Sequence, residues 1–256
     1  GEDLPDGTSV QHAAAVARGC FPWGDAVGAL AAAEAAEQLE DGLSPSWQGM
    51  RLLALGRARF LVGDYAGAKV PLELAVPAGY QVERPLLAAS AQALLARIAL
   101  AADDLESAEK HVSSALRALE SRGVTDQPGA GTTYVALGAL LAREGESGEA
   151  GDMLVRGLAR LRPTRDVLAI ADALLVYAPV RRALDSLASA RGLVDEARLL
   201  LADCTDPGAI GVEMIRRVPF GPELAADRTL SRGRVAVVAL DGRLRLVGIP
   251  EEIRRP

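Results

Sequence analysis

The sequence predicts an all-α protein, a superhelix of about five helix hairpins followed by a short tail. Three observations predict this fold. Segments with one shared pattern recur through residues 12–204. Within each segment the apolar residues return with the period of an α-helix. Half of the residues are hydrophobic but only 4% are aromatic, so we expect a core of Ala and Leu, which suits closely packed helices.

Residues 52–75 show how one hairpin is built. Apolar and small residues recur at helical spacing on both sides of Gly63-Asp64. Gly63 suits the left-handed conformation found just after a helix end, and Asp64 can cap the next helix. Gly56 and Ala68 are small, which lets the two helices cross closely.

Five segments align with this pattern without gaps. Their turns are Gly24-Asp25, Gly63-Asp64, Asp103-Asp104, Gly145-Glu146 and Gly192-Leu193. The small residue of the second helix is Ala29, Ala68, Ala108, Ala150 and Ala197, at spacings of 39, 40, 42 and 47 residues. The small residue of the first helix is Ala17, Gly56, Ala96 and Gly138, with Asp185 in the last copy. Helix pairs that repeat at such lengths predict a solenoid.

Turn and cap residues along the chain indicate where the expected elements begin and end. We expect a disordered N-terminus at 1–8, a repeat domain at 9–218 and a separate tail at 219–256. The first hairpin is expected at about 9–20 and 25–40. In the second, Ser44-Pro45 caps a helix at about 46–62.

Prolines and glycines bound the later helices. The second helix of the second hairpin should run from 65 to 76, kinked at Pro71 and ended by Pro77 and Gly79. The third and fourth hairpins are expected at 84–102 with 104–121 and at 132–144 with 147–161. A long stretch at 165–191, interrupted by Pro179, then pairs with 194–203. Asp206-Pro207 caps a short last helix that reaches Val218.

The tail permits two interpretations. Its β-prone runs at 234–240 and 243–247 flank Asp241-Gly242, a strong signal for a β-hairpin. Local propensity therefore favours a hairpin. The alternative, a helical segment, comes from a resemblance described below.

The repeats resemble the tetratricopeptide-repeat family. The matching residues are Leu55-Gly56, Leu137-Gly138, Gly63-Asp64-Tyr65, Ala68, Ala108 and Ala150. The resemblance implies a right-handed superhelix. Because the spacing exceeds the usual repeat of about 34 residues, the repeats look more like the MalT-like domains of LuxR-type transcriptional regulators.

Residues 230–253 are similar to the opening of a LuxR-type helix-turn-helix, which is the alternative for the tail. Leu230-Ser231-Arg232 and the Ile249–Ile253 segment match in place. Gly233 and Arg234 replace the characteristic Glu, and Pro250 stands where a helix should continue.

Catalytic and metal motifs are absent from the sequence. The two histidines, His12 and His111, sit in no metal or nucleophile pattern. The Gly-rich run at 129–133 lacks the Lys of a phosphate loop, and we interpret it as a loop and helix cap. We therefore predict a protein that is not an enzyme and has no cofactor.

Charge and cysteine content indicate which partners and which cellular compartment to expect. A net charge of −6 argues against a surface devoted to nucleic acid. Cys20 and Cys204 fall in the first and last repeats, which lie far apart in an open solenoid, so we expect no disulfide and a cytoplasmic protein. The apolar stretch 86–102 is broken by polar residues and predicts a buried helix, not a membrane span.

Arginines mark one position of the repeat. The residue after the small position of the first helix is Arg18, Arg57 and Arg97 in three consecutive copies. The resemblance implies that this position points into the concave groove, with Arg143 and Arg182 at other groove positions. The functional hypothesis is a groove that recognises an anion. The competing interpretation pairs each Arg with an acidic residue of a neighbouring helix.

Two functions remain open from the sequence. The first is a non-enzymatic sensing module, the effector- or protein-binding region of a LuxR/MalT-type regulator that stops before the recognition helix. It would bind a protein, a peptide or a small anionic effector in the groove, would not bind specific DNA by itself, and could self-associate. The alternative is a free-standing adaptor that assembles proteins.

Overall fold

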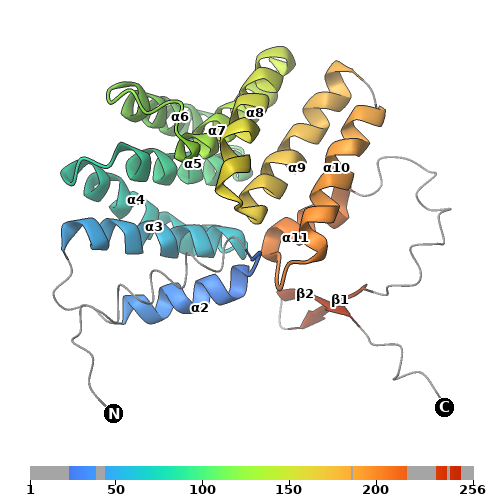
Figure 1. Cartoon of the computed structure of the whole chain (residues 1–256), viewed down its shortest axis with the longest axis horizontal. Coiled ribbons are helices and arrows are strands. Elements are labelled where there is room, and N and C mark those ends of the chain that lie inside the picture. The colour runs from blue at the N-terminus through green and yellow to red at the C-terminus, as the bar shows by residue number, and fades with distance from the viewer. Residues whose placement is uncertain (1–22, 39–43, 186, 218–234, 241–242, 249–256) are drawn as a thin grey trace, which may run out of the picture.

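A computed structural model describes residues 23–38, 44–185, 187–217, 235–240 and 243–248. The expected N-terminal end and the helix at 9–20 lie outside these residues. Within them the predicted all-α superhelix is confirmed, with helices following one another around the molecule (Figure 1). The helices are α2 (Ala26–Glu37), α3 (Pro45–Leu61), α4 (Tyr65–Gln81), α5 (Pro85–Ala101), α6 (Leu105–Glu120), α7 (Gly131–Glu144), α8 (Ser147–Leu161), α9 (Val167–Leu184), α10 (Leu187–Ala202) and α11 (Gly208–Arg217).

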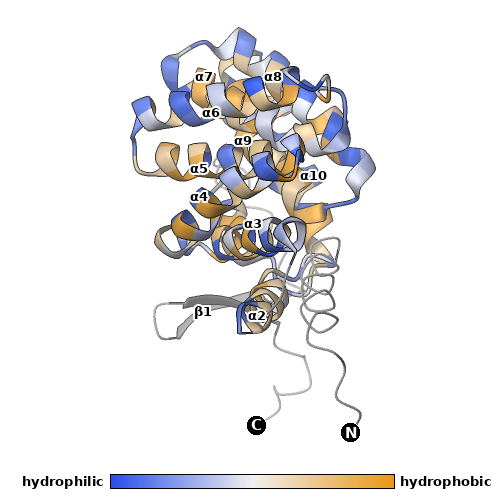
Figure 2. Cartoon of the chain, turned by 90° about the vertical axis from the view of Figure 1, so that its left-hand side faces the viewer, coloured by the Kyte–Doolittle hydropathy of each residue, from blue (hydrophilic) through white to orange (hydrophobic). Residues whose placement is uncertain are grey.

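Consecutive helices pack as hairpins: α3 with α4, α5 with α6, α7 with α8, and α9 with α10. Helix α2 occupies the position predicted for the second helix of the first hairpin. Aspartates cap three second helices, as predicted: the side chains of Asp25, Asp64 and Asp104 accept hydrogen bonds from backbone N–H groups three residues on. Apolar residues face the interior between the layers, and polar residues face outward (Figure 2).

The predicted turn of the fifth hairpin is wrong. Gly192 lies inside α10, which begins at Leu187, and α9 ends at Leu184, where the backbone of Asp185 (φ −134°, ψ −80°) leaves the helix. Gly192 is tolerated mid-helix because it faces solvent, and a Cβ added there would meet no atom within 4 Å. Pro179 also lies within α9, on its exposed side, and neither ends nor begins a helix.

The corrected turn makes the fifth repeat regular. Its small residues become Ala178 and Ala190, both fully buried. Ala190 follows Ala150 by 40 residues, so the apparent spacing of 47 disappears. The Asp185 and Ala197 assignments were therefore seven residues, or about two helical turns, too late.

A match in side-chain size joins the two helices of the hairpins α3–α4, α5–α6, α7–α8 and α9–α10. Gly56 receives the side chain of Leu72, and Gly138 receives that of Leu154. Where the first helix carries a larger Ala, the second carries a smaller Val. These pairs are Ala96 with Val112 and Ala178 with Val194. The size of the residue on the first helix and the size of the side chain that packs on it thus vary together: Gly occurs with Leu, and Ala occurs with Val.

Helix α4 continues past both of its prolines, contrary to the predicted end near Pro77. Pro71 has no N–H to bond the Gly67 carbonyl, but Nη1 of Arg59 donates to that oxygen at 3.1 Å. Pro77 lies on the exposed side, where water can satisfy the carbonyl that it leaves free. Gly79 is buried and allows α5 to approach closely.

The tail forms the predicted β-hairpin within its described residues. Strands β1 (Val235–Leu240) and β2 (Arg243–Gly248) pair antiparallel, with Leu240 opposite Arg243. Local β propensity therefore prevails over the helical alternative across these two runs.

The superhelix closes on itself, which the sequence did not predict. The loop before α11 meets the turn before α2: the Ala26 N–H donates to the Asp206 carbonyl at 2.8 Å, and the Asp206 N–H donates to the Gly24 carbonyl at 3.0 Å. We call these two hydrogen bonds the closing contact. Cys204 packs directly on Gly24. The expectation that the first and last repeats lie far apart is therefore wrong, while Cys20 itself lies outside the described residues.

Helix α11 fills the space between the two ends of the superhelix (Figure 1). It packs on α9, α10 and α3. Gly208 begins it with a positive φ of 55° and lies against the carbonyl of Leu61 and the methyl group of Ala26. A side chain at this position would strike both.

We expect Gly138→Ala to lower the free energy of unfolding by about 1–3 kcal/mol, because its methyl group would overlap Leu154. Adding Leu154→Val should recover much of this loss, since Ala with Val is the natural pairing in the third and fifth hairpins. Gly192→Ala is the control and should stabilise the protein by about 0.5–1 kcal/mol. Urea denaturation measures all three. An additive double variant, or a destabilising Gly192→Ala, would contradict the repeat alignment.

We expect Gly208→Ala to destabilise the protein more than Gly123→Ala. Both glycines have a positive φ, of 55° and 63°, so Ala is strained at each by about 1 kcal/mol. Only Gly208 lies against the first repeats, whereas a Cβ on Gly123 would meet nothing within 4 Å. Thermal unfolding compares the two variants. Equal losses would show that Gly208 makes no close contact in solution.

Candidate functional site

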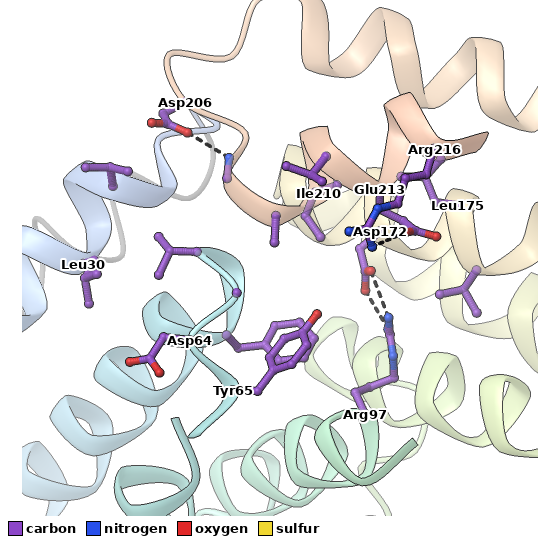
Figure 3. Close-up of a pocket in the computed structure, with 18 of the residues that line it drawn as sticks. Leu30, Asp64, Tyr65, Arg97, Asp172, Leu175, Asp206, Ile210, Glu213 and Arg216 are labelled. Carbon is purple, nitrogen blue, oxygen red and sulfur yellow. Dashed lines mark hydrogen bonds and ion pairs between the residues drawn. The ribbon is translucent and has the colours of Figure 1, made fainter. Parts of the chain in front are cut away.

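The candidate site is a cavity of about 600 Å³ on the inside of the closed superhelix. We call it the inner cavity. It is lined by α2, the turn between α3 and α4, α5, α9 and α11 (Figure 3). Elements from the first and last described helices, α2 and α11, thus border one space, and the closure of the superhelix brings them together.

An ion pair forms one wall of the inner cavity. The guanidinium of Arg97 on α5 donates to Asp172 on α9 through two parallel hydrogen bonds, of 2.6 and 3.0 Å (Figure 3). Both side chains are less than 20% exposed. Burial alone would lower the pKa of Arg97, but the charge and hydrogen bonds of Asp172 together outweigh burial and raise it. Arg97 therefore stays charged, and its two hydrogen bonds to Asp172 join α5 to α9.

A second arginine makes an equivalent bridge. Arg57 on α3 contacts Asp166, the residue that caps α9. The other carboxylate oxygen of Asp166 accepts the Ala169 N–H at 3.1 Å. Two consecutive repeats thus direct an arginine at α9, and α9 supplies a carboxylate to each.

The other predicted arginines are placed differently. Arg143 contacts Asp103 and donates to the Leu100 carbonyl at 3.3 Å, so it joins neighbouring hairpins at their ends. Arg182 is exposed on α9, and Arg18 lies outside the described residues. Of the four that lie within the described residues, the structure brings Arg57 and Arg97 together. An anion that entered the groove would have to compete with the carboxylates that these two already bind.

Aromatic rings lie beside the ion pair. Tyr65 and Phe60 have ring centroids 5.3 Å apart, and the Arg97 guanidinium sits 5.9 Å from the Phe60 centroid. Burial, and next the charge of Asp172, raise the pKa of the Tyr65 hydroxyl. Tyr65 therefore stays neutral at physiological pH and offers both an aromatic surface and a hydroxyl group.

The sequence indicated few of the residues that form the cavity. Arg97 was chosen from its place in the repeat, but Asp172, Tyr65 and Glu213 were not. Asp172 could have been inferred from two facts together. Arg57 and Arg97 occupy the same position in successive repeats, and α9 with its cap offers two acidic residues six positions apart, Asp166 and Asp172, one for each arginine. The contribution of α11 carries no repeat signal.

The rest of the described chain adds no metal or membrane feature. No group of three or more His, Cys, Asp and Glu side chains that could hold a metal was found among the described residues. Likewise, none of the helices described is both long and apolar enough to cross a membrane.

Comparisons with known proteins bear on the fold. No protein-family model matches the sequence, and no curated protein matches it. Among solved structures, a thermophilic tetratricopeptide-repeat protein of Thermus thermophilus is similar over 81% of this chain and 97% of its own, with 17% identity and a TM-score of 0.50. The apo form of RapI is similar over 90% of this chain and 65% of its own, with 11% identity and a TM-score of 0.50.

A third similar structure is BtubC from P. vanneervenii, at 18% identity and a TM-score of 0.47, over 78% of this chain and 92% of that one. At these identities the likeness concerns the fold. The chain has a tetratricopeptide-like repeat domain.

We expect Asp172→Ala to lower the free energy of unfolding by about 3 kcal/mol, because it strands the buried guanidinium of Arg97. The double variant Arg97→Met/Asp172→Leu should lose less, since no unpaired charge remains. A double-mutant cycle in urea denaturation measures the coupling. Additive losses would show that the two residues do not form a pair in solution.

Proposed function

We propose that this chain is a non-enzymatic binding module that holds a peptide segment of a partner protein in its inner cavity. The observation that carries the proposal is the cavity itself. Its volume of about 600 Å³ falls within the range of about 300–1,000 Å³ that ligand sites occupy. Helical repeats commonly serve as binding surfaces, and here the surface curves around a half-open cavity.

The lining of the cavity suits a peptide. Apolar side chains from three elements, Leu30 on α2, Leu175 on α9 and Ile210 on α11, offer contacts for an apolar side chain. The Arg97–Asp172 pair and Tyr65 offer polar groups that fix orientation. A few placed polar groups among apolar ones are typical of binding sites.

The finer form of this proposal is a sensing region of a LuxR/MalT-type regulator. The corrected repeat spacing of about 40 residues supports it, because it is longer than the usual tetratricopeptide repeat. The strands β1 and β2 lie where the resemblance needs helix, which favours the free-standing adaptor instead. A cytoplasmic location belongs to both forms, as does the absence of sequence-specific DNA binding by this chain alone.

The anion hypothesis for Arg18, Arg57, Arg97, Arg143 and Arg182 stays a prediction within this proposal. Arg182 is the member on the exposed side of α9. An anionic effector that binds there should lose affinity in Arg182→Gln, without loss of the two bridges to α9.

A random-peptide library displayed on phage and selected on the full chain tests the proposed function. We expect selected peptides to bind at least tenfold more weakly to Val212→Trp, which places an indole in the cavity wall. Leu199→Trp is the matched control, because Leu199 on α10 is 71% exposed and does not line the cavity. Peptides that bind the wild type and Val212→Trp equally, or a selection that enriches none, would contradict the proposal.

A further inference from the structure

The charges of the inner cavity point to the class of segment that it holds. Its lining carries five carboxylates and two guanidinium groups, a formal charge of −3. The carboxylates are Glu34, Asp64, Asp172, Asp206 and Glu213, and the guanidinium groups are Arg97 and Arg216. The five carboxylates come from α2, α9, α11, the turn before α4 and the loop before α11, so several elements contribute to the excess of negative charge.

Both guanidinium groups already have a carboxylate neighbour. The charge of Arg97 is balanced by Asp172, to which it donates two hydrogen bonds. Arg216 lies at the rim with its side chain 74% exposed, where water screens it, and a carboxylate oxygen of Glu213 is 3.9 Å away. An anion in the cavity would therefore face an excess of carboxylates.

The carboxylates keep acceptor capacity. In Asp64 and Asp206 one oxygen, Oδ1, accepts a backbone N–H at 2.9 Å, while the second oxygen makes no hydrogen bond within the described residues. Glu34 pairs with a distant cation, Arg59 at 4.0 Å, and its side chain is 49% exposed. A carboxylate accepts several hydrogen bonds, so these groups can receive N–H donors from outside.

The aromatic and apolar walls favour a cation of a particular kind. The Tyr65 ring, 37% exposed, can lie against a guanidinium or ammonium group, as aromatic faces attract cations. Leu30, Ile210 and Leu175 can hold an apolar side chain beside it. Clefts lined by one sign of charge with apolar walls concentrate ligands of the opposite sign.

We propose that the inner cavity recognises a basic residue, Arg or Lys, next to an apolar side chain in a partner peptide. This inference rests on the proposed function and gives its ligand a chemistry. It runs against an anionic occupant of this cavity, since the charge of Arg97 on the cavity wall is consumed by Asp172.

Three labelled hexapeptides test the proposal on the full chain by fluorescence anisotropy. They share leucines at alternate positions and carry Arg, Gln or Glu at the others. We expect the Arg peptide to bind at least tenfold more tightly than the Glu peptide. Raising the salt concentration from about 50 to about 500 mM should weaken the Arg peptide by about tenfold and leave the Gln peptide unchanged, because exposed charges are screened.

A charge-neutral variant locates the effect. Glu34→Gln/Glu213→Gln keeps the shape of the cavity and should weaken the Arg peptide about fivefold, in line with partly exposed pairs. Glu120→Gln, exposed on α6 and outside the cavity, is the control and should change nothing. The Gln peptide should bind all three proteins equally.

The outcomes separate the two proposals. Equal or tighter binding of the Glu peptide overturns the cation inference, as does unchanged Arg-peptide affinity in the double variant. If library selection yields acidic or neutral peptides that Val212→Trp rejects, the proposed function stands and this inference falls. If no peptide of either kind binds, both fall.

Discussion

The structure depends on the closing contact between its first and last repeats. Stacked helix hairpins need only touch their neighbours, so a solenoid can grow open-ended. Here the loop before α11 returns to the turn before α2 through two backbone hydrogen bonds. That return turns a concave surface into a half-open cavity, and it places α11 where it forms one wall.

Closure also explains why the arginines are paired. Arg57 and Arg97 occupy equivalent positions in α3 and α5, and both reach α9. In an open superhelix such residues would face a groove filled with water. In the closed one they face another helix, and a buried guanidinium without a carboxylate would be costly. Asp166 and Asp172 meet that need, so the arginines stabilise the ring and leave the cavity acidic.

The sequence predicted the helices because their signals are local. The caps at Asp25, Asp64 and Asp104 and the small residues at helix crossings each act within one hairpin. The turn of the fifth hairpin was misplaced because Gly192 looks like a helix terminator in the sequence. The helix α9 instead ends just before Asp185, a residue type that does not signal a helix end. The end of α4 was misplaced because the hydrogen bond that compensates Pro71 comes from Arg59 on another helix.

The site was harder to predict than the fold because closure is a property of the whole chain. The repeat pattern identified Arg57 and Arg97 as inward residues. It could not show that α9 lies opposite them, since that depends on the summed rotation of all the repeats. The residues from α11 carry no repeat pattern at all, so neither Ile210 nor Glu213 could be assigned to a cavity before the fold was known.

Amide hydrogen exchange at Ala26, read by nuclear magnetic resonance, tests closure most directly. The first N–H of a helix has no partner within that helix, and in the described structure the equivalent N–H groups of Tyr65 and Leu105 bond no other residue. The Ala26 N–H donates to the carbonyl of Asp206 in the loop before α11. Exchange at Ala26 that is at least tenfold slower than its intrinsic rate, with Tyr65 and Leu105 unprotected, is the result expected of a closed superhelix. Equal, unprotected exchange at all three amides would mean that the superhelix is open and that the cavity does not exist in solution.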